Sequence, residues 1–385
     1  MLVQATVQDM RTYLATQQGG TTAEQRAKVF QRKMLRGDVR GAVKYLTATQ
    51  MGSVLLPDHI DEKTGSSVAE ILQSKHPDAR TLDGSMLPSY DTLPDFVTLD
   101  ITERVIEVVA CRLSGSAGLG GTDAHAVLHW LLQFGPVSQQ LRQTLAVFAM
   151  WLANDSPPWA AYRALMAGRL LALDKNPGVH PIGIGETWHH AIAKTILHVA
   201  GPDAKEACGT DQLCAGLESG VEGGIHAVQH MWDTHRMEEE WGFLLIDARN
   251  AFNEQNRTSM LWSVHHEWPS GARFAFNCYR HWSILVIHCN NGTGVFLHSQ
   301  EGVTQGDPLA IFTYGIGVLP LIRQLKLEFP AVEQFWYADD AGAGGTFAAI
   351  RHHFARLHEI GAHFGYFPEP SKSFLVVPQH SLESA

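Results

Sequence analysis

The sequence contains few cysteines, and they form no pattern typical of a cross-linked or zinc-stabilised small domain. The five, an odd number with no C-x-x-C pair, are Cys111, Cys208, Cys214, Cys278 and Cys289. This pattern argues against a disulfide framework and against a zinc knuckle. It predicts an intracellular protein in a reducing compartment.

Long hydrophobic runs are also missing. No apolar stretch approaches the roughly 20 residues that a membrane-spanning helix needs. The first residues, MLVQATVQDMRTYLATQQ, lack the basic start and apolar core of a secretory signal. We therefore expect no membrane among the partners of this protein.

Two catalytic strings are absent as well, the metalloprotease H-E-x-x-H and the phosphate-binding G-x-x-x-x-G-K-[ST]. The 21 histidines are scattered, and no pair of them has a third ligand at a zinc-site spacing. This distribution favours surface and packing roles for the histidines.

The sequence has fewer basic than acidic residues, and its formal net charge is -10. This value counts against nucleic-acid binding as a bulk property, because phosphate contact needs a basic surface. One local exception is residues 26–44, where seven Lys and Arg residues accompany a single acid, Asp38. The segment is either a solvated helix face or an arm that contacts phosphates, and the sequence leaves both open.

The chain is long and apolar enough to fold into two or three domains, with 385 residues of which 45% are hydrophobic. We expect a mainly helical region over 1–150, loop-rich at 51–100. Strands are predicted at 169–175, 179–184, 243–247, 281–289, 294–298, 335–345 (a hairpin) and 374–377. The helices predicted beyond residue 100 are 101–112, 123–132, 138–154, 160–167, 186–200 (stopped by Gly201-Pro202), 223–240, 251–267, 309–327 and 346–364.

Three acids stand at predicted strand ends. The string FWYADDAG at 335–342 places Asp339 and Asp340 at a hairpin turn, although such turns prefer Asn-Gly or Asp-Gly. Two neighbouring carboxylates repel each other unless a cation neutralises them. Asp247 ends the buried strand FLLID. It is either a helix cap or a site residue, and the cap interpretation is weakened because Asn250 lies nearer the helix start.

An antiparallel sheet backed by helices would bring the strand before Asp247 next to this hairpin. Clustered acids of this kind bind two Mg²⁺ ions, with Mn²⁺ as the alternative, and the ions clamp an in-line phosphoryl displacement. Lys175 and Lys372 would meet the triphosphate at the rim of such a site.

Further motifs follow in a characteristic order. They are the segment 173–194, LIDARNAFN at 245–253, EGVTQGDP at 301–308, YADD at 337–340 and GYFPEPSKS at 365–373. In this order the chain resembles reverse transcriptases of the non-LTR retrotransposon type, over residues 155 to 378.

The resemblance implies an α+β fold, a right-hand polymerase with an antiparallel palm sheet that carries three acids and is backed by helices. Fingers are expected at 151–205 and the palm at 206–385, after a mainly helical N-terminal region; no thumb is identified. The implied activity is RNA-directed DNA polymerisation, with an RNA template, a DNA primer and deoxynucleoside triphosphates as partners. The implied location is nuclear for an active retrotransposon enzyme.

The resemblance also assigns roles to single residues. Asp247, Asp339 and Asp340 would hold the metal ions, and Lys372 would be the general acid for pyrophosphate. Phe252 matches a steric gate against a ribose 2′-OH, with an ordinary core phenylalanine as the alternative. The remaining expected nucleotide contacts are Lys175, Ala248, Asn250, Gln305 and Gly306.

The chain departs from the family where it has His180 in place of an arginine and His189-His190 in place of a basic pair. Histidine is mostly neutral near pH 7, so we expect weaker attraction for a triphosphate. Two other functions stay open. One is a catalytically weak or inactive retroelement remnant that binds nucleic acid, and the other is an RNA-directed RNA polymerase, which Phe252 disfavours.

Overall fold

The computed structural model describes residues 54–383 except 90–91, 176–177, 217 and 290–292, together with residues 27, 28, 30, 31, 34 and 35. The chain divides into two compact units, Met1–Ser53 with Asp174–Pro177, and Val54–Leu173 with Gly178–Ala385. The second unit contains the features described below. The helices predicted within 1–50 and the basic segment 26–44 lie almost entirely outside the described residues.

Fourteen α-helices and nine strands are described. The helices are α4 (Val68–Ser74), α5 (Glu103–Ala110), α6 (Ala124–Leu132), α7 (Pro136–Asn154), α8 (Trp159–Met166), α9 (Thr187–Cys208), α10 (Leu213–Gly216), α11 (Gly220–His235), α12 (Ala251–Glu254), α13 (Arg257–Glu267), α14 (Pro269–Tyr279), α15 (Ala310–Gly317), α16 (Leu319–Glu328) and α17 (Phe347–Phe364). The strands are β1 (Val54–Leu55), β2 (Gly168–Asp174), β3 (Val179–Gly185), β4 (Trp241–Ile246), β5 (Ser283–His288), β6 (Gly294–Ser299), β7 (Glu333–Tyr337), β8 (Asp340–Thr346) and β9 (Phe374–Val376). Short 3₁₀ turns cover Gly84–Met86, Pro370–Lys372 and Gln379–Ser381.

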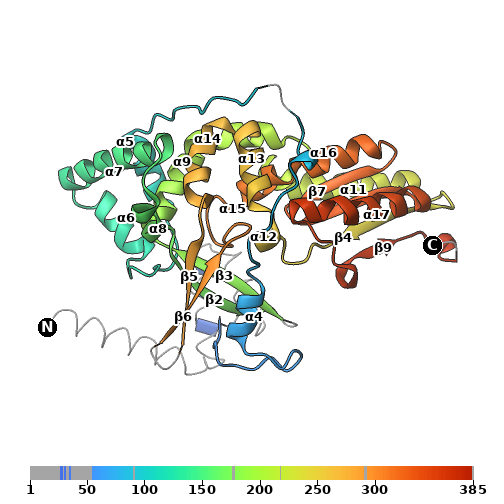
Figure 1. The fold of residues 1–385 in the computed structure, drawn as a ribbon, viewed down its shortest axis with the longest axis horizontal. Coiled ribbons are helices and arrows are strands. Elements are labelled where there is room, and N and C mark those ends of the chain that lie inside the picture. Colours follow the sequence, from blue (N-terminus) through green and yellow to red (C-terminus); the bar gives the residue numbers. More distant parts are fainter. Residues whose placement is uncertain are drawn as a thin grey trace. The chain divides into compact units, whose positions relative to one another are not determined.

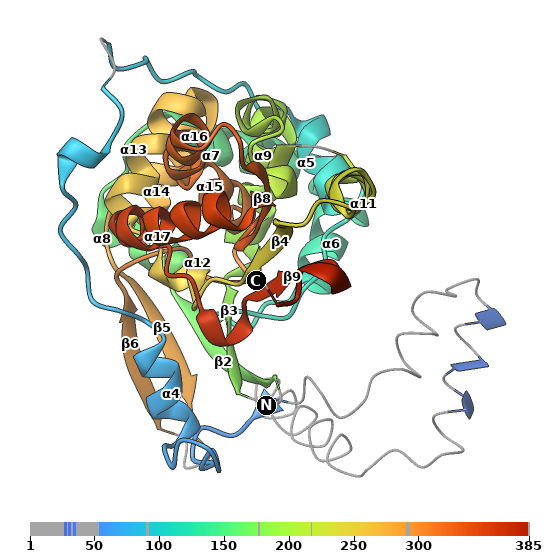
Figure 2. The ribbon, with the colours of Figure 1, turned by 90° about the vertical axis from the view of Figure 1, so that its right-hand side faces the viewer.

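A four-stranded antiparallel sheet in the order β7-β8-β4-β9 is the centre of the C-terminal half. The expected pairing of the strand before Asp247 with the hairpin is therefore confirmed. One face of the sheet carries Leu244 and Ile246 into the main hydrophobic core. Helix α17 packs against β4 and β8 (Figure 2).

Strand β8 is rich in glycine because an aromatic ring lies across it. On the other face of the sheet, Phe243 of β4 stands next to Gly342 and Gly344. A Cβ on Gly342 would come within 2.6 Å of the Phe243 ring. Small residues after the two acids thus let a core ring pack directly on the strand backbone, close to the turn.

A second, five-stranded sheet runs in the order β1-β2-β5-β6, with β3 paired to β2 (Figure 1). Strands β5 and β6 form the predicted hairpin, and the first two residues of β2 pair in parallel with Leu285 and Val286 of β5. Residues 283–299, which fall in the range predicted as palm, therefore share a sheet with residues 168–185.

Helix α4 covers this sheet and was not predicted. Val68 and Leu72 on α4 are fully buried against Leu170, Leu285 and other residues of the sheet. The helix starts with a capping box, in which Ser67 and Glu70 satisfy each other's backbone N–H groups. The capping signal is present in the sequence, but the surrounding Pro, Gly and Ser residues conceal it.

Three helix boundaries differ from the prediction. Helix α9 continues through Gly201-Pro202 to Cys208, since its buried face, including Ala200 and Ala204, packs in the core on both sides of the proline. Such packing compensates for the hydrogen bond that proline removes. The predicted helices 251–267 and 309–327 each divide in two, the first because Asn256 caps α13 and the second at Val318, before Pro320.

Helix α14 was not predicted: no expected helix or strand covered residues 268–280. The predicted strands and the other predicted helices after residue 100 are present with small shifts at their ends. Among the described residues, none of the helices is both long and apolar enough to cross a membrane. The fold is a mixed α and β arrangement with two sheets and many helices.

Candidate active site

The turn between β7 and β8 carries the two adjacent acids, one residue out of the predicted position. Tyr337 pairs with Asp340, so Ala338 and Asp339 form the two-residue turn and Asp340 begins β8. The prediction that both acids occupy the turn is wrong in this detail. Ala338 adopts a left-handed conformation with φ of 53°. That conformation is costly for a residue with a Cβ, so other contacts must hold it.

Two buried side chains hold this turn. Gln212, fully buried, donates from Nε2 to the Ala338 carbonyl at 3.0 Å and accepts from the Ala338 N–H at 2.8 Å. The Tyr366 hydroxyl donates to the Asp339 carbonyl at 2.9 Å. These bonds fix the backbone of both turn residues, Ala338 and Asp339. Sequence reasoning missed Gln212, because it lies 126 positions from Ala338 and belongs to no motif. Tyr366 lies in the motif at 365–373 but was assigned no role.

Asp247 lies at the same end of the sheet as these acids. It follows Ile246, which pairs with Ala341, so the next position on β4 stands beside Asp340. Burial raises the pKa of the Tyr366 hydroxyl well above its ordinary value, and the negative charges of Asp339, Asp340 and Asp247 raise it further. All three carboxylates therefore lie in electrostatic range of a single buried hydroxyl.

The loop 365–373 closes over Asp247. The Asp247 carbonyl accepts from the Glu369 N–H at 2.8 Å, and its own N–H donates to the Ser373 hydroxyl at 3.4 Å. Lys372 brings its ammonium to 3.4 Å from the Asp247 carboxylate and keeps 58% of its side chain exposed. Lys372 and the three acids thus lie at one end of the sheet, and the roles that the motifs assign to them stay predictions.

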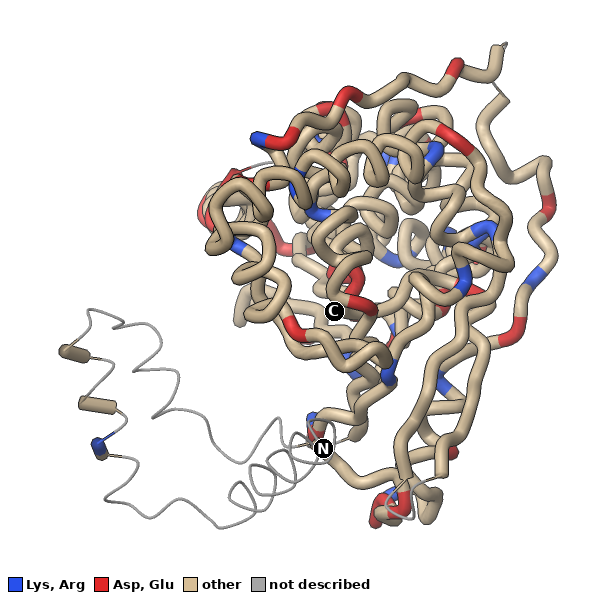
Figure 3. Tube along the Cα trace, turned by 90° about the vertical axis from the view of Figure 1, so that its left-hand side faces the viewer, with Lys and Arg blue, Asp and Glu red and all other residues tan. Residues whose placement is uncertain are grey.

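The metal ions themselves stay a prediction. Within the described part of the chain, no group of three or more His, Cys, Asp or Glu side chains is arranged to hold a metal ion. The chemistry of the donors nevertheless fits Mg²⁺, because all three are carboxylates and Mg²⁺ prefers oxygen ligands, several of them from water or phosphate. On the opposite side of the molecule, the left-hand side of Figure 1, acidic and basic residues are interspersed along the chain (Figure 3).

Phe252, the expected steric gate, lies on α12 five residues after Asp247. Its ring stacks on Tyr314 with 4.5 Å between the ring centroids, and it is half-buried. Its carbonyl accepts from the Val303 N–H at 2.7 Å. The core therefore fixes the ring in one position and leaves part of it exposed, an arrangement compatible with both the gate and the packing interpretation.

The two residues predicted beside Phe252 are held by other parts of the chain. Ala248 is buried and forms an antiparallel bridge with Pro368. Asn250 donates from its side chain to the Lys75 carbonyl at 2.7 Å and accepts from Asn253 at 3.0 Å. Asn250 is the N-cap residue of α12, as expected, but its side chain makes no capping hydrogen bond. Its amide holds the segment after α4 instead.

Gln305 and Gly306 lie against the end of β3. The Gln305 carbonyl accepts from the Gly183 N–H at 2.7 Å. Gly306 has φ of 110°, and a side chain there would collide with the Gly183 carbonyl. The loop predicted to approach a template base and nucleotide is therefore fastened to the 168–185 hairpin by backbone contacts that require glycine.

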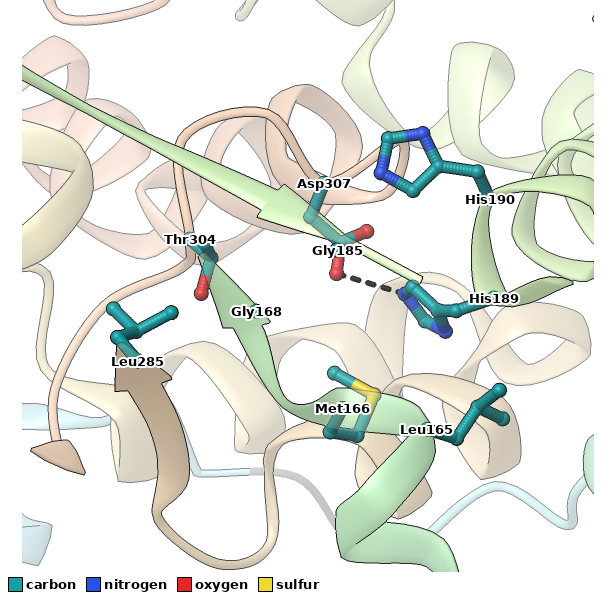
Figure 4. Close-up of a pocket in the computed structure, with 9 residues that line it drawn as sticks. All are labelled: Leu165, Met166, Gly168, Gly185, His189, His190, Leu285, Thr304 and Asp307. Carbon is teal, nitrogen blue, oxygen red and sulfur yellow. Dashed lines mark hydrogen bonds and ion pairs between the residues drawn. The ribbon is translucent and has the colours of Figure 1, made fainter. Parts of the chain in front are cut away.

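Next to this loop, the buried side chains of His189 and Asp307 lie within hydrogen-bond distance (Figure 4). The His189 Nε2 and Asp307 Oδ2 atoms are 3.0 Å apart, with side chains 3% and 4% exposed. Burial alone would raise the pKa of Asp307, but the His189 charge and hydrogen bonds from His189 and Leu309 keep it below its ordinary value. His189 thus holds the loop and is not exposed to a triphosphate.

His190 lines the same small cavity, whose volume of about 10 Å³ holds about one water molecule. Burial lowers the pKa of His190 to about 4, so this ring is neutral near pH 7. Neither histidine therefore replaces the basic pair of the family. Lys175 is exposed directly after β2 and belongs to the first unit, so its contact with phosphates stays a prediction.

No protein-family model and no curated protein sequence matches this chain. The solved structures that it resembles include three telomerases. That of Candida albicans, in complex with the TWJ fragment of telomeric RNA, is 12% identical with a TM-score of 0.44, over 64% of this chain and 48% of that one. Apo telomerase of Candida tropicalis is 9% identical with a TM-score of 0.43, over 56% of this chain and 45% of that one. Apo telomerase of Candida tropicalis truncated from the C-terminal domain is 11% identical with a TM-score of 0.42, over 65% of this chain and 62% of that one. The chain thus spans less than two thirds of the length of each telomerase chain that it resembles.

Proposed function

We propose that this chain is an RNA-directed DNA polymerase that adds deoxynucleotides to a primer 3′-OH. The observation that carries the proposal is the meeting of Asp247, Asp339 and Asp340 at one end of the four-stranded sheet. The three acids come from two distant sequence segments, and like charges gathered at one end of a sheet repel each other unless a cation neutralises them.

The carboxylates would hold two Mg²⁺ or Mn²⁺ ions, which supply charge neutralisation at the attacking and leaving oxygens of phosphoryl transfer. The chain's own groups would do the rest. Lys372, exposed and with its ammonium 3.4 Å from the Asp247 carboxylate, would donate a proton to the departing pyrophosphate. The fixed ring of Phe252 would reject a ribose 2′-OH on the incoming nucleotide.

RNA-templated extension of a DNA primer in Mg²⁺ tests the proposal. We expect deoxynucleotide incorporation by the unaltered chain and a loss of at least about 100-fold in Asp339→Asn, since charge stabilisation by one group is commonly worth that much. The exposed Glu333, at the far end of β7, provides the matched control Glu333→Gln, which should extend normally. Absence of synthesis, or synthesis that is indifferent to Asp339→Asn, contradicts the proposal.

A second function, nucleic-acid binding without catalysis, is favoured by one observation. The Asp247 carboxylate already has a cationic neighbour in Lys372, and no ready-made metal group exists among the described side chains. Salt-sensitive binding to an RNA–DNA duplex, with no extension in Mg²⁺ or Mn²⁺, would identify this function.

A further inference from the structure

A second site on the molecule, away from the three acids, combines exposed aromatic rings with positive charge. It is a cavity of about 400 Å³ between the start of α8 and the strands β5 and β6, here called the Trp282 pocket. Six of its seven lining residues are aromatic or basic, namely Trp159, Arg163, Arg280, His281, Trp282 and His298. Helix α8 packs on β5, so the helix and the strand that line the cavity are in contact (Figure 1).

The aromatic groups stand as separate ring platforms. Trp282 is 52% exposed and lies next to His298, with 6.0 Å between the ring centroids. Trp159 lies next to His281, with 5.2 Å between centroids. A half-exposed indole ring gains only part of the free energy that full burial in a core would give. Such rings are typical of surfaces on which a flat ligand stacks.

Two arginines give the pocket its positive charge; one is held by hydrogen bonds, and the other is exposed. Arg280 donates to the Ser156 hydroxyl at 2.9 Å and to the Pro157 carbonyl, so its position is set by the backbone after α7. Arg163 is exposed on α8, and no hydrogen bond or ion pair to it is found in the described part of the chain. No acidic residue lines the pocket. Its chemistry therefore matches a ligand that is both planar and anionic.

We propose that the Trp282 pocket binds a base and the adjoining phosphate of a single-stranded nucleic acid. Stacking on Trp282 accepts any base, and Arg163 and Arg280 meet the phosphate. The volume accommodates one nucleotide unit, since ligand pockets of about 300–1,000 Å³ hold small molecules. The proposal does not depend on the polymerase activity, because none of the three acids takes part.

The test uses the full chain without divalent metal and a 12-nucleotide oligouridylate that carries one 5-bromouridine. Photocrosslinking followed by mass spectrometry should place the crosslink on the peptides that contain Trp282 or Trp159. Fluorescence anisotropy with the same oligomer should show a dissociation constant raised about 5- to 100-fold in Trp282→Ala. Trp282→Phe should restore most of the binding, because a ring remains.

Arg163→Ala should weaken binding and reduce the slope of log K against log salt by roughly 0.7, as expected for one phosphate contact on a single strand. The control is Trp130→Ala, because Trp130 is another exposed tryptophan, on α6 and 41% exposed, that does not line the pocket. Unchanged affinity in both Trp282→Ala and Arg163→Ala would overturn the proposal. Uridine monophosphate binding as tightly as the oligomer would overturn the assignment to a strand.

Discussion

Gln212 should be the residue on which the geometry of the acidic turn depends most. It satisfies both backbone groups of Ala338, a buried residue whose left-handed conformation costs roughly 1–2 kcal/mol. Gln212→Met keeps the volume of the side chain and removes both hydrogen bonds. Each buried backbone group left without a partner costs about 1–3 kcal/mol, so the free energy of unfolding should fall by about 2–6 kcal/mol.

The assay is urea unfolding followed by circular dichroism, with primer extension in parallel. Gln324→Met is the matched control, because Gln324 makes a single bond to Glu328 on the surface of α16 and should change stability by less than about 0.5 kcal/mol. If Gln212→Met unfolds at the same urea concentration as the unaltered chain, the turn is held by something else. If it loses stability but extends primers normally, the link from the turn to the chemistry is refuted.

Three further predictions concern single side chains. Burial lowers the pKa of His353 to about 4, whereas the pKa of an unfolded histidine is about 6.5, so the free energy of unfolding should fall as the pH drops from about 6.5 towards 4. In urea unfolding measured across this pH range, His353→Leu should reduce the loss, and the exposed control His352→Leu should not. Phe252→Ala should raise ribonucleotide relative to deoxynucleotide incorporation at least about tenfold, and an unchanged ratio would mean that the ring only packs on Tyr314. Ala338→Gly should raise the free energy of unfolding by up to about 1 kcal/mol, because glycine adopts φ of 53° without strain; a loss of stability would show that the alanine methyl group matters more.

Much of the fold could be predicted where local patterns and tertiary packing agree. The hairpins at β2–β3, β5–β6 and β7–β8 follow from apolar runs separated by turn residues. Asp247 at the end of β4 follows from a buried strand that ends in a charge. The pairing of β4 with β8 was predicted from the succession of strands and helices, as an antiparallel sheet backed by helices, and is present in the structure.

The unpredicted parts are those that depend on distant contacts. The Gln212 clamp joins residues 126 positions apart, and the His189–Asp307 pair joins residues 118 apart, so no sequence window contains either. Helix α9 passes through Pro202 because its packing outweighs a local stop signal. The sequence predicts His189 as a weak substitute for a basic residue, but in the structure its buried side chain contacts Asp307. Its role depends on burial, which the sequence pattern did not reveal.

The central claim is that Asp247, Asp339 and Asp340 act as one unit in phosphoryl transfer. Single-turnover primer extension should compare Asp247→Asn, Asp339→Asn and the double variant, with Glu333→Gln as the control at the opposite end of β7. Residues that act as a unit have non-additive effects, so the double variant should be about as slow as the slower single variant. Asp247→Asn with normal extension, or two independent losses that multiply in the double variant, would contradict the claim.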